Sequence, residues 1–210
     1  MDMVFDGGVL EMTLGGATSL GTSEHQVFTV EKGGMEVAIA GGIVHGFSTP
    51  FVGEGVVAKT GAGVMTILPC DVAGHDVIEA EGGLEVREGS VNLGGETISV
   101  SGIWGAGIVT NGTLAGTIVA KSGTTAADVL TLGDGLTARQ RIMVFVTADD
   151  PGSLEKRQVI PVAKVAGAAV DISAWRCRVA NKNLSAVLFA EDSVIYARLT
   201  AHRGFRMNFK

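Results

Sequence analysis

The residues able to do acid–base chemistry are scattered through this sequence. Each histidine stands at least 20 positions from the next: His25, His45, His75 and His202. His75 precedes Asp76, but adjacent residues of a strand point to opposite faces, so the pair favours a surface turn over an acid–base couple. Asp149 and Asp150 stand directly before Pro-Gly, which turn chemistry explains, with calcium binding as the minor alternative. These residues predict no metal site.

Motifs with a defined catalytic mechanism are not found in the sequence. It contains neither a Gly-x-Ser-x-Gly elbow nor a phosphate-binding loop, and Gly105-Ala106-Gly107 lacks the third glycine of a dinucleotide site. Cys70 and Cys177 do not have the Cys-x-x-Cys spacing of a zinc site. We expect both to be small buried residues. A glycosidase pair of carboxylates stays open, because such pairs come from distant segments. We predict a protein without catalytic residues or cofactors.

Aromatic and basic side chains are the remaining candidates for contact with a partner. Trp175 alternates with polar residues in the segment WRCRVA, so we expect it in the core, and Arg176 and Arg178 on the opposite, outward face. Trp104 lies in the glycine-rich segment GIWGAG and is the better candidate for an exposed ring. We predict Trp104, Arg176 and Arg178 as partner contacts.

The elements that must position these residues are short and bounded by glycine. GGMEVAIAGG, residues 33–42, places six alternating residues between two diglycines, and GGVLEMTLGG, residues 7–16, repeats the frame. Glycine permits tight turns, so the diglycines predict corners between strands. Because the frames do not recur at a constant interval, a strict solenoid is not indicated. Residues 1–120 predict short strands in a sandwich or an intertwined oligomeric shaft.

Glycine content and charge both change near Ala138. Residues 1–138 hold 28 of the 31 glycines and a net charge of −12, whereas residues 139–210 have a net charge of +6. The second segment predicts strands at 141–148, 158–166, 175–180 and 205–209, with Pro161 confined to an edge or a bulge. We expect an all-β, oligomeric fold. Its Gly-rich acidic β region, 1–138, precedes a basic antiparallel sandwich or meander domain, 139–210.

Composition also bears on partners. The basic segment has no run of positive charge, which favours a solvated face over nucleic-acid binding. The second interpretation is that this segment docks onto an acidic neighbour, such as another copy. Residues 97–120 are uncharged but rich in Ser, Thr and β-branched residues, which favours buried strands over a membrane span. The first residues show no secretory signal.

The chain has 46% apolar residues and a mean hydropathy of +0.36. We therefore expect part of its apolar surface to be buried between subunits.

Two segments carry a resemblance to a known class of protein. LTLGDGLTARQRIMVFVTADD, residues 130–150, resembles the opening of many bacteriophage fibre knob domains, and AVDISAWRCRV, residues 169–179, is similar to their second hairpin. The resemblance covers residues 129–180 and concerns turn-and-strand patterns. It implies a homotrimer that acts in the virion or in host attachment, and it brings no catalytic residue.

These observations predict a non-enzymatic virion structural protein, most simply a trimeric phage fibre or surface protein. Its partners would be further copies, other virion proteins, and a host receptor or polysaccharide. The alternatives are a capsid decoration protein, a bacterial surface adhesin, and a polysaccharide-degrading enzyme on a β scaffold. Nucleic acid and a membrane span are not among the expected partners.

Overall fold

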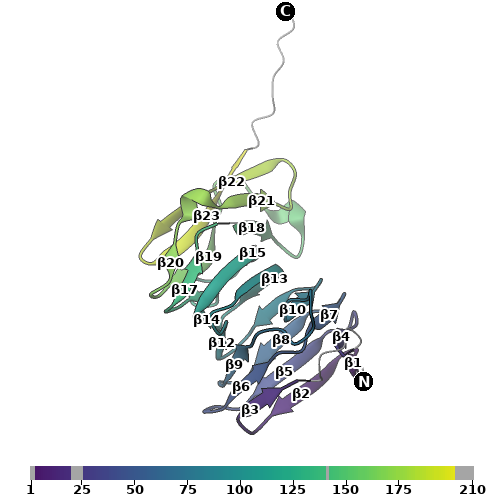
Figure 1. Ribbon diagram of the computed structural model, residues 1–210. Helices are drawn as coiled ribbons and strands as arrows, with labels where there is room; N and C mark the ends of the chain where they lie inside the picture. Colours follow the sequence, from purple (N-terminus) through teal and green to yellow (C-terminus); the bar gives the residue numbers. More distant parts are fainter. Residues whose placement is uncertain (1–2, 20–25, 141, 202–210) are drawn as a thin grey trace, which may run out of the picture.

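The computed structural model describes residues 3–19, 26–140 and 142–201. The described residues form strands joined by turns, together with two short 3-10 turns, Pro151–Ser153 and Ile172–Ala174. The strands coil repeatedly around one core. Figure 1 shows the coils stacked from β1–β3 at one end to β20–β23 at the other.

Each of the first four coils has three strands. They are β1 (Met3–Phe5), β2 (Gly8–Met12), β3 (Gly16–Thr18), β4 (Phe28–Val30), β5 (Met35–Ile39), β6 (Val44–Phe47), β7 (Phe51–Gly53), β8 (Val57–Thr60), β9 (Val64–Ile67), β10 (Ile78–Ala80), β11 (Leu84–Val86) and β12 (Ser90–Asn92). The glycine-bounded frame 33–42 thus forms one strand, β5, between two turns. Its diglycines are corners, as the sequence predicts.

The later coils contain longer strands. They are β13 (Thr97–Gly105), β14 (Ile108–Thr110), β15 (Gly112–Lys121), β16 (Thr131–Leu132), β17 (Leu136–Ala138), β18 (Ile142–Thr147), β19 (Val159–Val165), β20 (Ala169–Val170) and β21 (Arg176–Val179). β15 pairs with β17 through its first residues and with β18 through its last six, so it covers two sides of a coil. A hairpin of β22 (Leu184–Glu191) and β23 (Val194–Ala201) completes the described fold.

The coils have three faces, which we name A, B and C. Face A holds β1, β4, β7 and β10, and continues through the first halves of β13 and β15 to β17 and β20. Face B holds β2, β5, β8, β11, the second halves of β13 and β15, β18 and β21. Face C holds β3, β6, β9, β12, β14, β16, β19, β23 and β22. The molecule is a three-faced parallel β-solenoid.

The expected antiparallel sandwich or meander is wrong. Among the described residues, only β19–β23 and β22–β23 pair antiparallel, and all other strand pairs are parallel. A corner between two faces does not bring consecutive strands side by side. Each strand therefore pairs with its counterpart one coil away instead of with the next strand in the sequence.

The absence of a constant repeat did not exclude a solenoid. Gly8, Met35, Val57, Leu84 and Ile103 are successive partners on face B, and they are separated by 27, 22, 27 and 19 residues. The differences arise in the connections between faces, such as residues 68–77 between β9 and β10. A solenoid requires that its strands stack, and loops of unequal length permit this.

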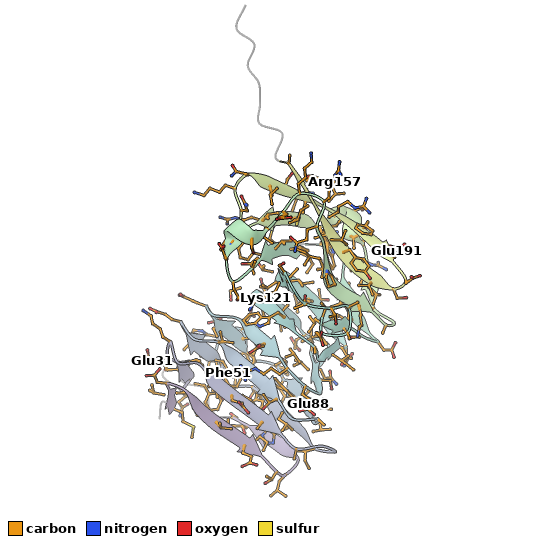
Figure 2. All side chains as sticks on the ribbon, turned by 180° about the vertical axis from the view of Figure 1, so that it is seen from behind. Glu31, Phe51, Glu88, Lys121, Arg157 and Glu191 are labelled. Atoms are coloured by element: carbon orange, nitrogen blue, oxygen red, sulfur yellow. The ribbon has the colours of Figure 1, made fainter. Side chains whose placement is uncertain are left out.

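The core runs along the inside of the stack. Alternate residues of each strand point inward, as in β5, where Met35, Val37 and Ile39 are buried. Phe28 and Phe51 occupy paired positions on face A, and their rings stack with centroids 4.8 Å apart. Figure 2 shows Phe51 among the first coils of the stack. Stacked aromatic rings on consecutive coils add to the stabilisation that burial provides.

Residues 139–201 continue the solenoid and do not form an antiparallel meander. β18 pairs in parallel with both β15 and β21, and β19 lies between β16 and β23. The pairing of β19 with β16 is limited to Lys164 and Val165, so Pro161 has a strand partner on one side only, in β23. Its pairing with β23 shifts register between Pro161 and Ala163, as expected for a bulge. The predicted strand at 205–209 lies outside the described residues.

The expected boundary near Ala138 stays a prediction. One cluster of buried residues contains side chains from both sides of it, and Trp175 Nε1 donates a hydrogen bond of 2.9 Å to the Ala138 carbonyl. Trp175 is buried, as its alternation predicts.

Candidate ligand groove on face B

The outward side chains of face B form a row that crosses the coils. Glu36, Ala58, Glu85 and Trp104 occupy paired positions on β5, β8, β11 and β13. Strands in a sheet are about 4.8 Å apart, so side chains at paired positions are direct neighbours. Ala58 is the smallest member of the row, and its short side chain leaves a depression between the two glutamates.

Two hollows lie on either side of Trp104. The first has a volume of about 280 Å³ and is lined by Trp104, Glu85, Glu36 and Arg87, with the glycines of the neighbouring corners. The second has a volume of about 230 Å³, and its lining includes Trp104, Glu85, Lys121 and Asp128. We call the two hollows together the Trp104 groove.

The ring of Trp104 is half-buried and rests on its own strand. A Cβ atom at Gly102, two residues earlier on the same side, would lie 3.5 Å from Trp104 Cζ3 and 3.1 Å from Val119 Cγ2. The missing side chain at Gly102 therefore leaves the room that the indole ring and Val119 share. Trp104 is held as a partly exposed platform between the two hollows.

Ionic contacts fix the polar side chains of the first hollow. Arg87 Nη2 lies 2.7 Å from Glu85 Oε2, and Arg87 Nη1 lies 3.8 Å from Glu36 Oε2. Thr60 donates a hydrogen bond of 2.7 Å to the second carboxylate oxygen of Glu36. Both carboxylates thus have partners within the protein. Glu85 is the one adjacent to Trp104, and Glu36 lies two strands further along the row.

The second hollow has its own charged side chain. Lys121 Nζ lies 2.8 Å from Asp149 Oδ1, and this hydrogen bond raises the pKa of Lys121. Lys121 lies in the middle of the stack (Figure 2). The groove as a whole combines one aromatic surface with hydrogen-bonding groups of both signs of charge. This combination suits a ligand with apolar faces and many hydroxyl or amide groups.

The structure brings the three predicted contact residues onto one face, but not into one hollow. Arg176 and Arg178 are exposed on β21 and pair with Met143 and Phe145 of β18. β21 is separated from the strand of Trp104 by β15 and β18. Neither arginine lines the Trp104 groove.

Two of the histidines considered as acid–base candidates contact other residues within the fold. His45 is buried, with Nε2 2.8 Å from Thr18 Oγ1 and Nδ1 3.2 Å from the Leu14 carbonyl. His75 Nδ1 lies 2.7 Å from Glu79 Oε2. His25 and His202 lie outside the described residues. Within the described part of the chain, no three His, Cys, Asp or Glu side chains converge as metal ligands would.

Both cysteines are free and half-buried. Burial raises the pKa of the Cys70 thiol, and it raises that of Cys177 to about 11. Raised values keep both thiols protonated near neutral pH, which is unlike a catalytic nucleophile.

Sequence reasoning missed Glu36, Glu85 and Arg87. A signal was present: GGMEV, residues 33–37, and GGLEV, residues 82–86, place a glutamate at the same position after a corner. In a solenoid this position faces outward on face B, so both glutamates join one row. The signal has this meaning only once the strands are known to stack.

Among the residues that the structure describes, no helix is long and apolar enough to cross a membrane. Comparison with protein-family models gave no match for this sequence, and the search of curated proteins gave none either.

Proposed function

We propose that this chain is a non-enzymatic structural protein of a virion, a fibre or surface protein that acts in assembly or host attachment. In this role the Trp104 groove binds a surface polysaccharide. The observation that carries the proposal is an aromatic platform with fixed polar neighbours, displayed on the side of a continuous β-solenoid. The resemblance of residues 129–180 to fibre proteins supports a role in the virion through the sequence pattern alone, because β20 and β21 pair in parallel with β17 and β18 and form no hairpin.

The chemistry of the groove supports a carbohydrate ligand. A sugar ring has an apolar face that packs on an indole ring, and its hydroxyl groups bond to fixed carboxylate and guanidinium groups. Glu85 and Arg87 are already oriented by their 2.7 Å contact, so binding a sugar orders few further side chains. The row of outward positions along face B allows a ligand longer than one sugar.

The same contacts favour binding over catalysis. Glu36 and Glu85 both contact the Arg87 guanidinium. In a glycosidase the two carboxyl groups act directly on the glycosidic bond, one as the acid and one as the base or nucleophile, whereas these two carboxylates are both paired with one cation of the protein. The polysaccharide-degrading alternative uses this same groove, so one experiment addresses both readings.

The experiment measures binding of the purified protein to a panel of bacterial capsular and surface polysaccharides. We expect binding to at least one of them, and Trp104→Ala should weaken it by about tenfold or more. Phe189→Ala is the matched control, since Phe189 is a half-buried aromatic residue of the β22–β23 hairpin, away from the groove. Equal losses in both variants, or no binding to any polysaccharide, would contradict the groove assignment.

Product analysis separates binding from cleavage. Polysaccharide incubated with the wild-type protein should keep its chain length in size-exclusion chromatography. Depolymerisation that Glu36→Gln or Glu85→Gln abolishes would replace this proposal with the enzymatic one. A capsid decoration protein would instead bind preassembled shells, and its binding would not depend on Trp104.

The proposal includes a homotrimer, and face C supplies its contact surface. Val44, Val64 and Ile108 lie in one outward row across β6, β9 and β14, with Ser90 of β12 between them. Val44 and Ile108 are 55% and 41% exposed. Apolar residues at such exposure favour burial against another subunit. Extrapolated to low protein concentration, sedimentation equilibrium should give three times the chain mass, and Val44→Glu with Ile108→Glu should lower it.

A further inference from the structure

The two ends of the solenoid have matching strand edges. At the first end, β1, β2 and β3 each pair on one side only among the described residues, and at the other end the same holds for β20, β21 and β22. β22 is antiparallel to β23, which is antiparallel to β19, so β22 runs in the direction of the solenoid strands. Each face therefore ends in a free edge of the same direction at both ends.

The core is incompletely covered at the first end. Phe5, Leu10 and Met12 are only half-buried, although each packs against the core. Their paired residues one coil further in, Val30, Val37 and Ile39, are fully buried. Three outward or corner residues beside them are 61–77% exposed: Val4, Val9 and Leu14.

The other end shows the same feature. The inward side chains of its last strands, Val170, Cys177 and Leu188, are half-buried, whereas Val144, which pairs with Cys177, is fully buried. An end of this kind would be completed by one more coil with inward apolar residues and strands in the same direction.

We propose that a second copy of this chain supplies that coil, so that copies stack head to tail along the solenoid axis. The strands β20, β21 and β22 of one copy then lie beside β1, β2 and β3 of the next, and all three faces continue in parallel. The backbone groups of the free edges gain hydrogen-bond partners. The half-buried apolar residues of both ends become core.

Charge favours this arrangement over the symmetric ones. The exposed outward charge of β2 is Glu11, and the exposed outward charges of β21 are Arg176 and Arg178. Head-to-tail stacking places β2 beside β21 on face B. With the register of this face continued across the junction, Arg178 lies beside Val9 of the next copy. Glu11 is then two residues along the strand from Arg178, so opposite charges lie near each other. If two first ends met, Glu11 of one copy would face Glu11 of the other. If two of the other ends met, Arg176 and Arg178 would face the same arginines. Both arrangements bring like charges together, which costs electrostatic free energy.

The contact is heterologous, because it joins two different surfaces of the chain. Such a contact leaves one free surface at each end of the stack and does not close unless the stack curves. The mass of the assembly should therefore rise with protein concentration. The inference is independent of the polysaccharide groove and of lateral contacts through face C.

Analytical ultracentrifugation of the full chain over a range of concentrations tests the proposal, with charge reversals at each end. Glu11→Arg should raise the dissociation constant by about tenfold or more at low salt, and Arg176→Glu with Arg178→Glu should do the same. A mixture of the two variants should associate again, because opposite charges meet at every junction of a stack in which the two variants alternate. Glu81→Arg, at an exposed position of the fourth coil, is the control and should leave association unchanged.

Four results would overturn the proposal. They are a mass that does not depend on concentration, association that the Arg176 and Arg178 reversals leave intact, a mixture that does not recover association, and a loss in Glu81→Arg equal to that in Glu11→Arg. Circular dichroism of each variant confirms that the fold is kept.

Discussion

The most unusual single residue in this solenoid is Lys59. It occupies an inward position of β8, paired with Val37 and Val86, and its side chain is fully buried. Its ammonium group donates hydrogen bonds to the carbonyls of Gly61 and Glu88, the latter at 3.0 Å. These two carbonyls belong to consecutive coils at one corner, so Lys59 joins the coils from the inside.

Replacing Lys59 with methionine tests this role. Lys59→Met keeps the length of the side chain but removes the donor from two corner carbonyls. We expect the free energy of unfolding to fall by about 1–3 kcal/mol, measured by urea denaturation at pH 7. An unchanged value would show that these carbonyls need no donor from Lys59.

Lys59→Met also tests how the stability of the protein depends on pH. Burial lowers the pKa of Lys59 below its ordinary value of 10.5, and the charge of Glu88 opposes the shift. Between the folded and the unfolded pKa, the unfolded chain binds more protons, so stability rises with pH in that window. The advantage of the wild type over Lys59→Met should grow as pH rises towards 10.5. A difference that is constant with pH would contradict the lowered pKa.

Cys177 provides a second test at this scale. With a pKa of about 11, its thiolate fraction at pH 8 is small. Alkylation of the native protein by iodoacetamide, followed by mass spectrometry, should be at least about a hundredfold slower at Cys177 than for a free thiol. In urea, the alkylation rate of Cys177 should rise to that of a free thiol. Fast native alkylation would show that Cys177 is not desolvated.

At the scale of elements, the corners determine how closely the coils stack. A Cβ atom at Gly55 would lie 1.9 Å from the carbonyl oxygen of Glu31, which belongs to the preceding coil. Glycine is needed there for close approach of two backbones and not for an unusual dihedral angle. The corner glycines thus explain why the acidic region is rich in this residue.

Two alanine substitutions distinguish close approach from the general effect of removing glycine. Gly55→Ala should lower the free energy of unfolding by about 2–3 kcal/mol, because the two coils must separate. Gly41→Ala is the matched control, since its Cβ atom would meet only the Ala62 side chain at 3.7 Å. Thermal unfolding should show a clear loss for the first and little change for the second. Equal effects would mean that corner packing does not limit the stack.

At the scale of the whole molecule, the sheets pass through the position where glycine content and charge change. β15 pairs along six residues with β18, on the far side of Ala138. Solenoids gain stability from contacts between neighbouring coils, so coupling through this interface decides whether the two regions unfold together.

The two tryptophans report on the two regions separately. Trp104 lies in β13 and Trp175 lies before β21, so Trp104→Phe and Trp175→Phe each leave one reporter. We expect fluorescence and circular dichroism to give the same denaturation midpoint within each variant, as for one cooperative unit. Separate midpoints would support independent domains at 1–138 and 139–210.

Part of the site was predictable and part was not. The alternation around Trp175 predicted a buried ring, and Trp175 is buried. The glycine-rich surroundings of Trp104 predicted an exposed ring, and the structure has this ring half-buried. Glu36, Glu85 and Arg87 are far apart in the sequence, and they meet only because β5, β8 and β11 stack in register. Their proximity depends on coil lengths that no local pattern encodes.

The sequence by itself determined where the strands and corners lie and which side chains face the core. Side-chain alternation and glycine punctuation act over a few residues, so they are readable locally. Only the tertiary structure decided which strands pair, in which direction, and which outward residues share a face. A strand offers the same hydrogen-bonding groups to parallel and antiparallel partners, and the choice depends on which distant segment each corner brings alongside.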